Sequence, residues 1–113
     1  MLATITPTDS FKDNLALLPA IAGVERIDVI AADGAIAATI PNAPGKQGSL
    51  AVYQYLFQAF GGLNADAAAH GLAVFAEHTA DARNRPGAHP NIDLLLNVVD
   101  GGAALTIVVI PAA

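Results

Sequence analysis

The chain has 113 residues, enough for one domain, and only 13% of them are charged whereas 54% are hydrophobic. Ten Asp and Glu against five Lys and Arg give a formal net charge of −5, which excludes the basic surface that nucleic acids and anionic membranes require. The chain has no cysteine, which excludes disulfides, thiolate metal sites and cysteine nucleophiles.

The first part of the chain predicts a helix and a β-hairpin. Residues 10–18 carry apolar side chains at helical spacing, beginning with Phe11, and Pro19 would end that helix. Ser10 and Asp13 have a spacing like that of a capping box at its start. Residues 24–31 alternate as a strand does. The following Asp33-Gly34 pair is typical of a tight hairpin turn, because both residues tolerate positive φ. Residues 35–40 form the predicted return strand.

The second part predicts three helices and a last strand. Residues 49–60 are amphipathic, and a single longer helix is expected from Asn64 to about Arg83. A further helix opens at Pro90 and closes before two glycines. Residues 105–110 are apolar on both faces except for one threonine, a pattern typical of a central strand.

The predicted order is therefore α-β-β-α-α-α-β in one domain covering residues 1–113. This order favours an α+β fold. In it a small antiparallel or mixed sheet, made of the hairpin and the C-terminal strand, carries about four helices on one side. The last strand should pair with the hairpin, because an isolated hairpin is barely stable in water.

The location and cofactors can also be predicted. A helix needs about 20 apolar residues to cross a bilayer, and the sequence has no such run. The N-terminus lacks the positive segment and apolar stretch of a signal peptide, so a cytoplasmic protein is expected. The sequence carries neither a dinucleotide fingerprint nor a nucleophile elbow. We therefore expect no cofactor, and an enzyme is the less favoured interpretation.

The loop of residues 42–49, between a predicted strand and a predicted helix, is the first candidate site. Its two glycines allow a ligand to approach the backbone, and the start of the helix presents unpaired N–H groups to an anion. Lys46 and Ser49 would add donors. The spacing is not that of a Walker loop, in which Lys directly follows the second glycine. The alternative is a turn that only caps the helix.

A polar cluster in the second half of the chain is the second candidate site. Its members are Glu77, His78, Asp81, Arg83, His89 and Asp93. Histidines and carboxylates three or four residues apart share a helical face, as metal ligands and acid–base pairs must. His78 lies at the edge of the apolar stripe and is the best single candidate. Structural roles are the alternative, with Asp81 paired to Arg85 and with His89 and Asp93 capping the next helix.

Contact between copies of the chain is the third feature that the sequence suggests. The helical wheel places Tyr55 away from the apolar stripe and among glutamines, where an exposed tyrosine would suit an interface. The scarcity of charge and the apolar last strand point the same way, with Val108 as a second interface candidate. We expect a homo-oligomer, most simply a dimer.

Three segments of the chain, residues 44–53, 76–83 and 86–93, resemble a family of short bacterial proteins that is known only as domain of unknown function 2322. The resemblance extends from about residue 11 to 110. It implies a bacterial and cytoplasmic protein. Because it brings no activity with it, no catalytic residue carries over.

Two functions remain open from the sequence. The favoured one is a homo-oligomeric interaction or adaptor module without catalysis. The alternative is a binding protein for a small anion or a metal, or an enzyme, with a site formed by the loop of residues 45–49 and by His78, Asp81, His89 and Asp93. The alternative becomes the leading hypothesis if these two segments converge on one cleft, and it weakens if they lie at opposite ends of the fold.

Overall fold

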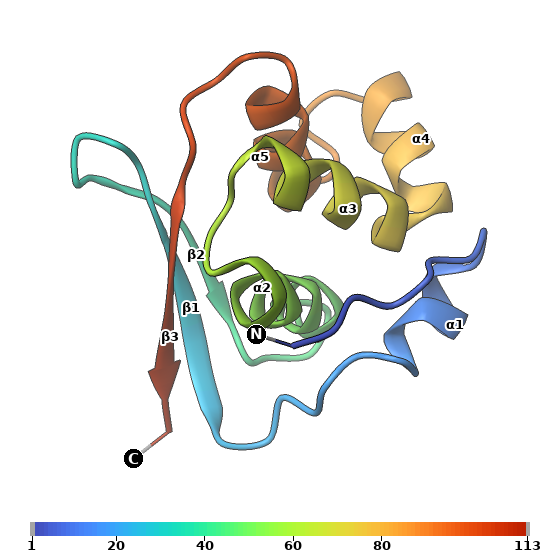
Figure 1. The fold of residues 1–113 in the computed structure, drawn as a ribbon, viewed down its shortest axis with the longest axis horizontal. Coiled ribbons are helices and arrows are strands. Elements are labelled where there is room, and N and C mark those ends of the chain that lie inside the picture. The colour runs from blue at the N-terminus through green and yellow to red at the C-terminus, as the bar shows by residue number, and fades with distance from the viewer. Residues whose placement is uncertain (1, 113) are drawn as a thin grey trace.

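A three-stranded antiparallel sheet with five helices on one side makes up the fold in the computed structural model, which describes residues 2–112 (Figure 1). In chain order the elements are α1 (Phe11–Leu15), β1 (Val24–Ile30), β2 (Ile36–Pro41), α2 (Gln47–Phe60), α3 (Ala65–Phe75), α4 (Glu77–Asn84), α5 (Pro90–Val99) and β3 (Thr106–Pro111). The predicted α+β class and order are confirmed, with one more helix than expected. No helix within residues 2–112 is long and apolar enough to span a bilayer.

The sheet has the order β2-β1-β3, so the C-terminal strand pairs with the hairpin as predicted. Ile27 of the central strand pairs with Ile40 on one side and Val109 on the other. The prediction that the last strand is central is wrong, because β1 occupies the centre and β3 lies at the edge. The second apolar face of β3 is open instead, and Val108 on it is 38% exposed.

Helix α2 lies between the sheet and the other helices, and it contacts all three strands as well as α1 and α3 (Figure 1). A helix with neighbours on several sides buries more than one stripe of side chains. The prediction that Tyr55 is exposed is therefore wrong: its side chain is fully buried. Its hydroxyl accepts a hydrogen bond from the Ile5 N–H at 2.8 Å. Phe57, which the helical spacing of residues 49–60 places on the apolar stripe with Leu50 and Tyr53, is 39% exposed.

The single helix predicted up to Arg83 is broken at Ala76, which has φ +52° and ψ −119°. Alanine is the best helix former, so nothing in the local sequence signals the break. The Thr79 hydroxyl donates to the Leu72 carbonyl at 2.6 Å and satisfies a carbonyl at the end of α3. Helix α4 consequently takes a new direction, and the side chains of the polar cluster turn with it.

Asn14 fixes the N-terminal segment to the body of the protein. Its side chain is fully buried, and its amide donates to the carbonyls of Thr8 at 3.0 Å and Val74 at 2.9 Å. The side-chain oxygen of Asn14 accepts from the Thr8 N–H in return. Ser10 caps α1 as predicted, through a bond from the Asp13 N–H. These contacts place Phe11, the first residue of α1, beside α3 and α4.

Candidate functional site

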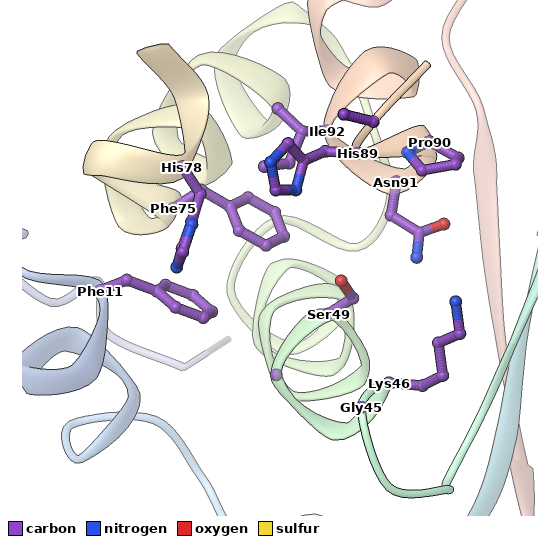
Figure 2. Close-up of a pocket in the computed structure, with 12 residues that line it drawn as sticks. Phe11, Gly45, Lys46, Ser49, Phe75, His78, His89, Pro90, Asn91 and Ile92 are labelled. Carbon is purple, nitrogen blue, oxygen red and sulfur yellow. The ribbon is translucent and has the colours of Figure 1, made fainter. Parts of the chain in front are cut away.

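A pocket of about 230 Å³ lies between the start of α2 and the loop that precedes α5 (Figure 2). Four of the residues selected from the sequence line it: Lys46, Ser49, His78 and His89. Lys46 comes from the end of the loop between β2 and α2, and Ser49 comes from the first turn of α2. The histidines come from α4 and from the residue before α5. The two candidate segments therefore meet in one pocket, which is the arrangement that favours a binding site.

The start of α2 forms one wall of the pocket. Lys46 occupies the position before the helix, and its side chain makes no capping hydrogen bond. Leu50 is the first residue of the helix whose N–H is bonded, to the Lys46 carbonyl at 3.1 Å. Within residues 2–112 no carbonyl or side chain accepts from the N–H groups of Gln47, Gly48 or Ser49. These donors are the part of a helix that attracts anions.

The start of α5 forms the opposite wall. His89 precedes the helix and Pro90 is its first residue, where a missing N–H costs nothing. The Tyr53 hydroxyl donates to the Asn91 carbonyl at 2.6 Å, so α2 and α5 are tied together below the pocket. Burial raises the pKa of Tyr53, and its hydroxyl keeps its proton for this bond.

Asp81 orients His89 from outside the pocket. Its Oδ2 atom lies 2.6 Å from His89 Nε2. An ionised carboxylate can only accept, so the hydrogen of that bond belongs to Nε2 and the donor is the imidazole. Asp81 also pairs with Arg85, which confirms the predicted pair four residues apart. The Arg85 bond, and after it the His89 bond, hold the pKa of Asp81 well below its usual range.

A row of rings closes one end of the pocket. The Phe11 and Phe75 rings are stacked with centroids 5.3 Å apart, and His78 meets Phe11 edge-on at 5.0 Å. The His78 and His89 rings lie 5.7 Å apart. Glu77 holds the row in place because its Oε1 atom accepts from the Phe11 N–H at 2.7 Å, a bond that also lowers the pKa of Glu77.

Asp81 does not line this pocket, and neither do three other members of the predicted cluster. Glu77 and Arg83 border a second, more open groove of about 690 Å³ between the N-terminal segment and helices α3 and α4. Asp93 accepts from the Gly87 N–H at 3.0 Å and so stabilises the loop before α5. Among residues 2–112 no group of three or more histidines and carboxylates is placed to hold a metal ion. The cluster is thus divided between a pocket, a groove and a loop.

Sequence reasoning missed the apolar side of the site. Phe11 and Phe75 fall on helical stripes and were assigned to the core, where many such residues do lie. Asn91 carried no signal at all, although its side-chain amide points toward Lys46 at one end of the pocket (Figure 2). Gly48, one of the two glycines of the first candidate loop, was the signal on this side, because a glycine allows a close approach of another group, here the Phe11 ring.

A family model described as an uncharacterized protein conserved in bacteria (DUF2322) matches residues 11–109. The match includes every residue that lines the pocket. No curated protein and no solved structure matches the chain.

Proposed function

The chain belongs to the DUF2322 family of uncharacterized bacterial proteins, and we propose that it binds a small anion in the pocket between α2 and α5. One observation carries the proposal. Lys46 supplies a positive charge to the lining, which includes no Asp or Glu, although the chain has ten acidic residues and only five Lys and Arg. A cavity lined by one sign of charge concentrates ligands of the opposite sign.

The backbone supports the same choice. The N-terminus of α2 carries a partial positive charge, and its first N–H groups are free to donate. Asp81, which contacts His89 of the lining, is also paired with Arg85, which reduces its repulsion of an anion. Lys46 and the start of α2 are therefore complementary to one negative group.

The size of the pocket and the contacts around Ser49 favour binding over catalysis. A volume of about 230 Å³ is below the range of roughly 300–1,000 Å³ that holds drug-sized ligands. An activated serine is normally hydrogen-bonded to its base. In the part of the chain that the structure describes, Ser49 makes no hydrogen bond to His78 or His89. The proposal is accordingly a binding protein for a small anion. The proposal includes a cytoplasmic location, because proteins of the reducing cytosol rarely contain disulfides and this chain has no cysteine.

Calorimetric titration with phosphate, sulfate and acetate tests the proposal. The wild-type protein should bind at least one of them, and an anion at a hundredfold excess over its Kd should stabilise the fold by about 2.7 kcal/mol. Lys46→Met should weaken the binding. Lys12→Met is the matched control because it removes the same charge outside the pocket. Equal effects of the two substitutions, or no binding of any anion, would contradict the proposal.

A second candidate function, association of two copies through β3, is favoured by a different observation. This strand lies at the edge of the sheet, has no charged residue and leaves Val108 38% exposed. Natural edge strands usually carry charges that prevent pairing with another strand. Two β3 strands could pair antiparallel about a twofold axis and extend the sheet.

Sedimentation velocity tests this association. We expect a dimer in the wild type and a shift to monomer in Val108→Lys. Ile36→Lys is the control, since Ile36 is 61% exposed on the opposite edge strand. A wild-type protein that is monomeric at all concentrations would rule the association out. Tyr55, being buried, offers no such test.

A further inference from the structure

The two ends of the pocket differ in chemistry. Phe11, Phe75 and His78 lie at one end, whereas Lys46 and Asn91 lie at the other (Figure 2). We infer that the ligand is a small aromatic carboxylate, with its ring against the aromatic end and its carboxylate directed at Lys46 and the start of α2. This inference rests on the proposed function and specifies the class of anion.

The aromatic end can accept one more ring. Aromatic side chains prefer offset-stacked or edge-on contacts with centroids about 4.5–7 Å apart. The row from Phe75 through Phe11 and His78 to His89 contains three such contacts, at 5.3, 5.0 and 5.7 Å. A planar ligand lying against this row repeats the same geometry, which a saturated ring or a short alkyl chain cannot do as well.

Gly48 sets how close the donors of α2 come to the aromatic end. A Cβ atom at this position would lie 3.2 and 3.3 Å from two ring atoms of Phe11, which is tighter than most real contacts. The glycine thus lets the first turn of α2 pack directly against the ring. Because donors and rings are adjacent, the carboxylate of the ligand should be joined directly to its ring, as in benzoate.

Both walls of the pocket are fixed before a ligand arrives. Glu77 holds Phe11 through the backbone, and Tyr53 holds the start of α5 through the Asn91 carbonyl. A preformed site loses less entropy on binding, so a small ligand can bind measurably. The pocket of about 230 Å³ suits one ring with a carboxylate and is too small for a nucleotide.

Titration of the full chain with five related compounds tests the inference. The compounds are benzoate, its neutral analogue benzamide, cyclohexanecarboxylate, acetate and phosphate, each measured by calorimetry at constant ionic strength. We expect benzoate to bind about tenfold or more tightly than each of the other four, which corresponds to about 1.4 kcal/mol.

The outcomes separate the two proposals. If acetate, phosphate or cyclohexanecarboxylate binds as tightly as benzoate, the anion site stands and the aromatic class is overturned. If benzamide matches benzoate, the pocket does not select for charge and the anion proposal itself fails. If no compound binds, both proposals fail.

Substitutions of two phenylalanines test whether the ring of benzoate binds at the aromatic end of the pocket. Phe11→Leu should weaken the binding of benzoate about tenfold and leave the binding of acetate unchanged. Phe57→Leu, which removes a half-exposed ring outside the pocket, should change neither affinity. Should Phe11→Leu fail to fold, His78→Gln removes a ring from the same row without emptying the core. Unchanged benzoate affinity in the folded variant would overturn the inference.

Discussion

The hydroxyl of Tyr55 on α2 lies 2.6 Å from the Nε2 atom of His70 on α3. The same oxygen accepts from the Ile5 N–H, so its own hydrogen is free to be donated to the imidazole. When the hydroxyl donates, Nε2 is the unprotonated acceptor of a neutral His70. Burial lowers the pKa of His70, in agreement with that state.

This contact predicts an acid-sensitive component of stability. A histidine with a lowered pKa binds fewer protons in the folded state, so its stabilising contribution is complete above its ordinary pKa of 6.5 and is lost as the pH falls below it. The melting temperature of the wild type should decrease between about pH 7.5 and 5. His70→Gln, which keeps an acceptor that does not titrate, should reduce that decrease. Parallel curves for the two proteins would contradict the assignment.

The contacts of Asp81 predict a second pH-dependent contribution to stability, at lower pH. Here the stabilising form of the side chain is the charged one, whereas for His70 it is the neutral one. Its pKa is lowered by Arg85 and His89, so its contribution is present above the ordinary value of 3.8 and is lost as the pH falls below it. Asp81→Asn should be less stable than the wild type at about pH 6, and the difference should shrink below about pH 4. Urea denaturation at several pH values measures this difference. A gap that does not depend on pH would argue against the ion pair.

Ala76 predicts a stabilising substitution. Its φ of +52° and ψ of −119° strain a residue with a Cβ atom by about 1–3 kcal/mol, but glycine adopts them freely. Glycine also makes the unfolded chain more flexible, which costs about 0.4–1 kcal/mol. Ala76→Gly should therefore raise the free energy of unfolding by about 1 kcal/mol in denaturant titration. Ala80→Gly, within α4, should lower it by a similar amount. If both variants lose stability alike, Ala76 is not strained.

Tyr53 predicts a link between packing and binding. Tyr53→Phe removes the donor to the Asn91 carbonyl and should cost about 1 kcal/mol of stability. It should also weaken anion binding, because the start of α5 is no longer tied to α2. Tyr55→Phe is the matched control, since its hydroxyl is equally buried but bonds Ile5 and His70 away from the pocket. Equal affinities in the two variants would show that the Tyr53 bond does not position the site.

Local patterns in the sequence predicted those parts of the fold that depend on local interactions. The Asp33-Gly34 turn and the alternation of residues 24–31 specified the hairpin, and the cap at Ser10 was correct. The edge position of β3 and the burial of Tyr55 depend on which elements pack against them, and a single helix or strand pattern does not contain that information. The break at Ala76 is imposed by tertiary packing on a residue that favours helix.

The residues of the candidate site also divide into those with a local signal in the sequence and those placed by tertiary packing. Lys46 and His89 were found because glycines, charges and helix starts carry local signals of ligand binding. The aromatic end was missed because Phe11 and Phe75 have the spacing of core residues, and only the packing of α1 against α3 and α4 turns them toward a cavity. Polar members of a site can thus be selected from one sequence more readily than the apolar ones.

Nuclear magnetic resonance of ¹⁵N-labelled protein, titrated first with phosphate and then with benzoate, shows whether the start of α2 and the loop before α5 bind one ligand together. The amide signals of Gly48, Ser49, His89 and Asn91 should shift along one saturation curve with one Kd, while the hairpin signal of Gly34 stays in place. Shifts confined to one of the two segments, or shifts that do not saturate, would contradict a shared site.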